Sequence, residues 1–260
     1  MRCVDVMELL ENLSPTSYAE GWDNVGLLLG RKDKTIHKVM LALDATDDVV
    51  QQAVLQNVDM LITHHPLLFS PLKRITEDDF IGRRIINLIK NDICYYAMHT
   101  NFDVMGMADA AADLLRLHQR EVLEVTFEDE VAKEGIGRIG KLPQEMSLKE
   151  CARYCKTVFD LGSVRIYGDE DAPVETVAIV PGAGDDYIKN ALSMQADVFI
   201  TGDIGHHDGL DAMEQGLAVI DASHYGIEKL FVPYMAEVFA NRMPELLVIK
   251  AAEKEPFNVV

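Results

Sequence analysis

Short apolar runs alternate with amphipathic segments along most of the chain, which predicts strands alternating with helices. Residues 39–63, VMLALDATDDVVQQAVLQNVDMLIT, contain an apolar strand, a turn, a helix and a second apolar strand. The acidic residues Asp47 and Asp48 fall in the first turn of that helix, where the helix dipole favours negative charge. The segment is a predicted β-α-β unit, which implies parallel strands and a right-handed crossover.

The same plan returns later in the chain. Residues 177–201, VAIVPGAGDDYIKNALSMQADVFIT, match residues 39–63 at an offset of 138 without a gap. Asp59 corresponds to Asp197 in this match. Farther on, the two copies share the pattern Ala-x-His-x-x-x-acid at an offset of 125, which aligns Ala97, His99 and Asp103 with Ala222, His224 and Glu228. The repeat indicates an internal duplication.

The predicted fold class is therefore α/β, with two similar halves and mixed sheets in a three-layer αβα arrangement. We expect residues 1–125 to form the first half and residues 126–260 the second, closely packed with the first as one structural unit. Residues 135–169 between the repeats predict extended segments around one helix, for which Ser147 and Glu150 form a capping box.

Histidine and acidic side chains come directly after three predicted strands. They follow the strands 60–63, 93–98 and 217–221, and are His64 and His65, His99 and Asp103, and His224 and Glu228. Ligands of open α/β sheets bind beyond the carboxyl ends of strands. Two adjacent histidines can converge only where the strand has ended, and Pro66 ends this one. His224 and Glu228, at spacing i and i+4, share one face of a helix predicted over 224–243.

Nitrogen and oxygen donors without thiolates are typical of a site for zinc, iron, manganese or cobalt. An isolated pair of histidines is more often a surface or core pair, but donors at three strand ends inside a duplicated frame favour a metal. Six donors exceed what one tetrahedral ion uses, so we expect two divalent ions about 3.5–4 Å apart and bridged by a carboxylate.

Composition excludes several other classes of function. The 260 residues carry a formal net charge of −19, which argues against a nucleic-acid partner. No window approaches the roughly 18 apolar residues of a membrane helix, so we expect a cytoplasmic protein without a membrane partner. Cys151 and Cys155 stand at helical spacing and are expected to share a buried face, not a disulfide or a metal.

Six motifs together resemble the Nif-three-like family of dinuclear-metal proteins, often labelled GTP cyclohydrolase I type 2 homologues. They are WDNVGLLLG (22–30), ITHHPLLF (62–69), HTNFD (99–103), GRIGKLP (137–143), ITGDIGHHDGLDA (200–212) and DASHYGIE (221–228). The resemblance covers nearly the whole chain and is to the short form, without the domain that longer members insert between the halves. It implies two intertwined halves related by a pseudo-dyad, and a toroidal homohexamer.

The resemblance also implies a ligand set. His64 and His224 would hold one ion, His65 and Asp103 the other, and Glu228 would bridge them. His99 is not usually a ligand in that family, so we interpret it as a group supporting the ligands, a proton carrier, or a structural residue. For His206 and His207, helix capping or contact with the ligands is expected in preference to direct ligation of an ion.

Because Gly202 and Asp203 stand where the first copy has His64 and His65, only one of two possible symmetric sites is expected. The segment GWDNVG, with Trp22 and Asp23, is interpreted either as a turn that approaches the site or as a packed turn before strand 25–29.

Two functions follow from such a site. A water between two divalent ions ionises near neutral pH, so a metal-dependent hydrolase acting on a nucleotide or another anionic small molecule is the first. The alternative is a metal-binding regulatory or interaction ring without turnover, which a closed coordination shell would favour. No P-loop, dinucleotide fingerprint or serine nucleophile motif is present in the sequence.

Overall fold

The computed structural model describes residues 1–259, which form two compact units. The first unit comprises residues 1–102 and 231–254, and the second comprises residues 103–230 and the chain from 255 onward. The chain thus passes from the first unit to the second and back. This division follows packing, whereas the predicted boundary at 125/126 follows the sequence repeat and stays a prediction.

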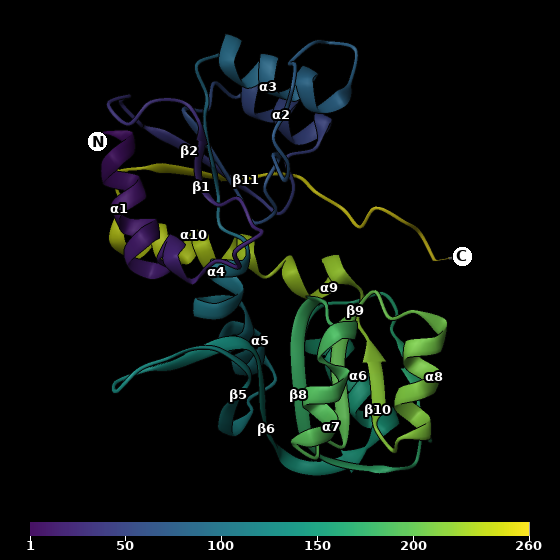
Figure 1. The fold of residues 1–260 in the computed structure, drawn as a ribbon. Coiled ribbons are helices and arrows are strands. Elements are labelled where there is room, and N and C mark those ends of the chain that lie inside the picture. The colour runs from purple at the N-terminus through teal and green to yellow at the C-terminus, as the bar shows by residue number, and fades with distance from the viewer. Residues whose placement is uncertain (260) are drawn as a thin grey trace. The chain divides into compact units, whose positions relative to one another are not determined.

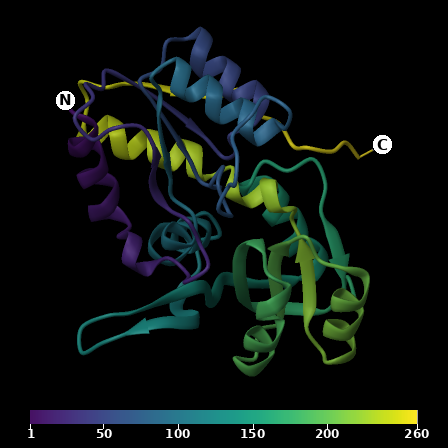
Figure 2. The ribbon, with the colours of Figure 1, turned by 45° about the horizontal axis from the view of Figure 1, so that its top comes forward.

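The first unit is built on a mixed five-stranded sheet of order β1-β4-β3-β2-β11, in which only β1 is antiparallel to its neighbour. Helices α2 and α3 cover one face and α1 and α10 lie on the other (Figures 1 and 2). Its elements are α1 (Cys3–Leu13), a 3-10 turn (Thr16–Tyr18), β1 (Gly26–Leu29), β2 (Lys38–Ala42), α2 (Asp47–Leu55), β3 (Met60–Thr63), α3 (Phe80–Lys90), β4 (Cys94–Ala97), α4 (Thr100–Phe102), α10 (Phe231–Arg242) and β11 (Leu247–Lys250).

The second unit has a mixed six-stranded sheet of order β5-β6-β8-β9-β10-β7, whose central strands β8, β9 and β10 are parallel. Helices α7 and α8 cover one face, and α5 and α6 lie on the other (Figure 1). Its elements are a π-helical turn (Asp103–Met107), α5 (Ala108–Leu114), β5 (His118–Glu128), β6 (Lys133–Ser147), α6 (Leu148–Val158), β7 (Arg165–Tyr167), β8 (Pro173–Ala183), a 3-10 turn (Asp185–Tyr187), α7 (Ile188–Ser193), β9 (Val198–Gly202), α8 (His206–Glu214), β10 (Ala218–Asp221) and α9 (His224–Glu228).

The structure confirms the predicted α/β class and extends the repeat. Residues 39–63 and 177–201 both form strand, helix and parallel strand, with the same register: Val39 pairs with Met60, and Val177 with Val198. Each copy also begins earlier than the sequence match, with a helix and an antiparallel strand: α1 and β1 in one unit, α6 and β7 in the other.

Asp59 and Asp197 are equivalent residues that make the same contacts, each within its own copy of the repeat. Asp59 accepts hydrogen bonds at Oδ2 from the backbone N–H groups of His37 (2.8 Å) and Lys38 (2.9 Å). Asp197 accepts the matching bonds from Glu175 (2.9 Å) and Thr176 (2.7 Å). Each aspartate thereby satisfies the first amides of the neighbouring strand, which explains why this residue is repeated at the offset of 138.

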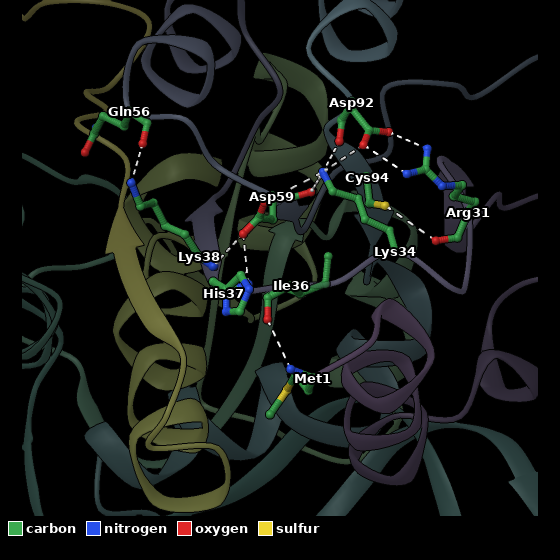
Figure 3. A network of polar contacts seen from close by, with 10 residues as sticks. All are labelled: Met1, Arg31, Lys34, Ile36, His37, Lys38, Gln56, Asp59, Asp92 and Cys94. Atoms are coloured by element: carbon green, nitrogen blue, oxygen red, sulfur yellow. Dashed lines mark hydrogen bonds and ion pairs between the residues drawn. The ribbon is translucent and has the colours of Figure 1, made fainter.

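The first unit adds a buried cation to this arrangement (Figure 3). The Lys34 ammonium, whose side chain is nearly buried, donates to the backbone oxygens of Asp59 (3.0 Å) and Asp92 at the starts of β3 and β4. Arg31 pairs with the Asp92 carboxylate (2.8 Å), and the Cys94 thiol donates to the Arg31 oxygen (3.8 Å). These contacts fix the ends of β3 and β4 that lie opposite the histidines.

Two sequence interpretations need correction. The helix predicted over 224–243 is two helices, α9 ending at Glu228 and α10 starting at Phe231, because Pro233 has no N–H for the carbonyl of Lys229. The Ala-x-His alignment is wrong by one residue: Ala97 pairs with Thr63, whereas Asp221 pairs with the equivalent Thr201. His99 therefore corresponds to Ser223, not to His224.

Other local predictions are confirmed. Ser147 and Glu150 form the capping box of α6, and Cys151 and Cys155 are buried on that helix as free thiols. None of the helices in residues 1–259 is long and apolar enough for a membrane span.

Candidate metal centre

Strand β3 delivers His64 and His65 from the first unit. The strand ends at Thr63, and the following turn is held by the buried side chain of Tyr95 on β4. The Tyr95 hydroxyl donates to the backbone oxygen of His65 (2.9 Å) and accepts from the N–H of Leu67 (2.8 Å). The turn allows both imidazoles to leave the strand on the same side, with ring centroids 4.9 Å apart.

His99 joins these two histidines from the end of β4. One ring nitrogen from each of His64, His65 and His99 lies within 4.8 Å of the others. The His64 ring is fully buried, and the other two are half-buried. The centroid of His99 lies 5.2 Å from that of His64 and 5.5 Å from that of His65. The sequence placed His99 near the ligands, and the structure puts it in the same donor cluster.

Each of the three imidazoles donates a hydrogen bond from Nδ1 to an oxygen atom. The partners are the backbone oxygen of Met98 for His64 (2.7 Å), Asp44 Oδ1 for His65 (2.9 Å) and Asp23 Oδ1 for His99 (3.0 Å). Nδ1 must therefore carry the proton, so Nε2 of a neutral ring carries the lone pair. Carbonyl and carboxylate partners at the distal nitrogen are the usual support of metal-binding histidines.

Asp23 is the most strongly held of these supports. Its side chain is fully buried and accepts from Thr100 N–H (3.0 Å) and Thr100 Oγ1 (2.5 Å) as well as from His99. Burial raises the pKa of the Asp23 carboxyl, but the hydrogen bonds from His99 and Thr100 outweigh it, and the pKa is lowered to about 2. Of the two interpretations of the GWDNVG turn, the structure supports the one in which Asp23 reaches the histidines.

The second unit supplies donors from α9. His224 Nε2 lies 2.9 Å from Glu228 Oε2, as the predicted i, i+4 spacing requires, and Glu228 is buried. His224 Nδ1 bonds Asp203 Oδ2 (2.9 Å), so this histidine shows the same support as those of the first unit. The Ser223 hydroxyl accepts from Gly226 N–H and caps the helix that carries both donors.

Asp103 is the third donor of this unit. It offers a carboxylate oxygen within 4.8 Å of one from Glu228. It begins the π-helical turn, and the buried Arg138 of β6 donates through Nη2 to the Val104 backbone oxygen in this turn (3.4 Å). The same guanidinium donates to Asp109 of the following helix α5 through Nε and Nη2 (both 2.8 Å). The GRIGKLP motif thus contributes a residue that positions the Asp103 segment.

Two glycines make room for the α9 donors. A Cβ at Gly182 would lie 2.3 Å from Glu228 Oε1, and Gly182 also has a φ of +77°. A Cβ at Gly202, the equivalent of His64 in the repeat, would lie 2.4 Å from the backbone nitrogen of His224. A histidine at this position of the second copy would therefore clash with α9, which gives a physical reason for the glycine at this point of the repeat.

His206 and His207 belong to none of these clusters. They are exposed in the first turn of α8, with ring centroids 5.1 Å apart.

Sequence reasoning missed Asp44 as a support for His65 and did not assign Asp203 to His224. Their common signal is a carboxylate just after a strand, at the same sheet edge as the histidines.

Comparisons with known proteins agree with this architecture. The Duf34/NIF3 (NGG1p interacting factor 3) family matches residues 1–256. A GTP cyclohydrolase 1 type 2 homolog of Clostridium perfringens is 36% identical over 265 residues, covering 100% of both chains. Another, from Clostridium acetobutylicum, is 38% identical over 230 residues, covering 88% of this chain and 85% of its own.

Solved structures show the same fold. A Bacillus cereus protein related to NIF3 superposes with a TM-score of 0.91 at 25% identity, covering 100% of this chain and 99% of its own. A hypothetical protein of Staphylococcus aureus gives a TM-score of 0.90 at 30% identity with the same coverage.

Proposed function

The chain belongs to the Duf34/NIF3 family, and we propose that it is a metal-dependent hydrolase with a dinuclear centre assembled from the donors of both units. The proposal rests on a hydrogen-bonding pattern that four histidines share. His64, His65, His99 and His224 each bond an oxygen atom through Nδ1, which is the usual support of a histidine that binds metal through its other nitrogen. Such a set fits divalent zinc, iron, manganese or cobalt.

The proposed ligand assignment uses both donor types. His64 and His224 would hold one ion, His65 and Asp103 would hold the other, and Glu228 would contribute to both. In the second unit, the proximity of the Glu228 carboxylate to both His224 and Asp103 supports a bridging role. His99 stays outside this assignment as a proton carrier.

Chain connectivity supports bringing the two donor sets together. The rings of Phe102 and Phe231, both of the first unit, lie 6.4 Å and 5.6 Å from the His64 ring. Asp103 follows Phe102 directly, and Glu228 precedes Phe231 by three residues. Three residues span at most about 11 Å, so the chain that carries each carboxylate leaves the first unit within a few residues of an aromatic ring that packs on His64.

When bound, two divalent ions would supply an acidified water and a Lewis acid for hydrolysis. Residues of the chain set the conditions for this chemistry. Asp103 and Glu228 would offset two of the four positive charges of the ions, and the Asp23, Asp44 and Asp203 carboxylates lie behind the histidines. An anionic substrate would therefore meet positive charge at the ions themselves. His99 is the proposed proton carrier, and the buried Asp23 carboxylate fixes the orientation of its ring.

The substrate class follows from charge and from the relatives. A nucleotide or another phosphorylated small molecule suits a positive site, and the curated relatives carry the name GTP cyclohydrolase 1 type 2 homolog. Hydrolysis of a ring carbon or of a phosphoester would both use the same site.

A panel of substrates tests the proposal. Metal-reconstituted protein should hydrolyse at least one nucleotide, cyclic phosphoester or phosphomonoester in an assay for released phosphate or opened ring. His65→Ala should abolish this turnover, whereas His206→Ala, which changes an exposed histidine outside the clusters, should keep it. Wild-type protein that binds its metal but turns over no substrate of the panel would contradict a hydrolase and favour a metal-binding ring without catalysis.

A further inference from the structure

Two large aromatic side chains lie exposed beside the donor cluster of the first unit. Trp22 is 63% exposed and Phe69 is 52% exposed. Both pack edge-to-face against the imidazole of His99, with centroid distances of 5.9 Å for Trp22 and 5.7 Å for Phe69. Exposed rings of this size are unfavourable in water, so a pair at a candidate site calls for a functional explanation.

The backbone that carries these rings is held firmly although the rings themselves are exposed. Asp23, next to Trp22, bonds His99 and Thr100, and Asn24 Nδ2 donates to the backbone oxygen of Leu68, next to Phe69 (2.6 Å). The two aromatic segments are thus tied to each other and to His99. An arrangement fixed before a ligand arrives lowers the entropy cost of binding it.

The charge around Phe69 differs from that of the rest of the chain. No acidic residue lies between Asp59 and Glu77, although the chain has 43 acidic residues. Lys73 and Arg74 are exposed in this stretch. The chain next to Phe69 is thus basic, and this local charge favours an anionic ligand over a cationic one.

We propose that Trp22 and Phe69 form an aromatic platform that stacks a planar heteroaromatic ring of the substrate beside His99. The inference rests on the proposed function and deepens it, because it selects phosphorylated compounds with such a ring over those without one. Stacking on a π-face accepts any aromatic base, so the platform recognises the ring but not one particular base. Both residues act by positioning and do not touch the ions.

Trp22 is the only tryptophan of the chain, so its fluorescence reports on the platform directly. We titrate metal-loaded and chelator-treated protein with guanosine monophosphate and, as the matched probe without a ring system, ribose phosphate. The nucleotide should quench Trp22 saturably, and ribose phosphate should not. Phe69→Ala should weaken nucleotide affinity about tenfold, the scale of one lost stacking contact, and Phe69→Tyr should restore it.

Phe80→Ala is the control variant, because Phe80 is 53% exposed but packs on Arg84 at the start of α3. It should leave the affinity unchanged. Equal responses to both probes would overturn the platform, and so would unchanged affinity in Phe69→Ala. It would also be overturned if iodide failed to quench Trp22 fluorescence at every protein concentration, because a second copy of the chain would then cover the rings. Metal-dependent hydrolysis together with any of these results would leave the proposed function standing.

Discussion

Hydrogen bonding at individual residues gives the site its chemical character. A histidine is an ambiguous residue in sequence, because either ring nitrogen can carry the proton. In this protein the acceptors Asp44, Asp23 and Asp203 and one backbone oxygen remove the ambiguity. These contacts orient the four imidazoles through Nδ1, the support that metal-binding histidines usually have.

Asp23 should leave a signature in the pH dependence of stability. Its folded pKa of about 2 lies below the ordinary value of 3.8, so the ionised carboxylate stabilises the fold. This contribution, about 2 kcal/mol, is fully present above pH 4 and is lost as the pH falls toward 2. Urea unfolding of chelator-treated protein should show the loss in that window.

Asp23→Asn should lack this pH-dependent contribution to the free energy of unfolding. Asp33→Asn, which changes an aspartate that is 83% exposed, should retain it. If wild type and Asp23→Asn lose stability in parallel between pH 4 and pH 2, the Asp23 carboxylate is not held as described.

At the scale of elements, the close approach of β8 to α9 matters most. Glu228 occupies the space where a Cβ of residue 182 would lie, so Gly182→Ala should displace its carboxylate. The positive φ adds strain of about 1 kcal/mol or more. We expect lower metal content and lower stability by urea unfolding. Gly162→Ala, where a Cβ meets no atom within 4 Å, is the control; metal content equal in both variants would refute the proposed role of Gly182.

Periodicity predicted the elements well because the repeated strands are buried and nearly uninterrupted. The offset of 138 also predicted the register of β2 with β3 and of β8 with β9, since no insertion separates the strands of each pair. The extra repeat elements α6 and β7 were missed, because their match to α1 and β1 lies in topology and not in residue identity. The alignment of His99 with His224 was wrong by one residue because it falls where a strand passes into a helix. There the two copies can be aligned in two ways that match the sequence about equally well.

The donor residues were predictable because they follow strands, but their supports were not. Asp44 and Asp203 look like ordinary acidic residues after a strand, in a chain with many of them. Only the distances to His65 and His224 distinguish them from solvated charges. Likewise, Trp22 and Phe69 are ordinary apolar residues in sequence, and their exposure beside His99 comes from packing.

At the scale of the whole molecule, the net charge of −19 contrasts with the positive charge of the proposed ions. An acidic surface repels polyanions such as nucleic acids, whereas a compact phosphorylated molecule can still be held by a local positive centre. The ring-shaped homohexamer that the family resemblance implies would not change this balance, and it stays a prediction.

The central claim is that donors of both units share one pair of ions, with Glu228 bridging them. Elemental analysis of purified wild type, Glu228→Gln and the control His207→Ala tests it most directly. Glu228→Gln keeps the shape of the side chain and removes its charge, so both ions lose a ligand. We predict two ions per chain in wild type and in His207→Ala, and a fall toward one or none in Glu228→Gln. Two ions retained in Glu228→Gln would show that Glu228 does not bridge the ions and would contradict the shared dinuclear centre.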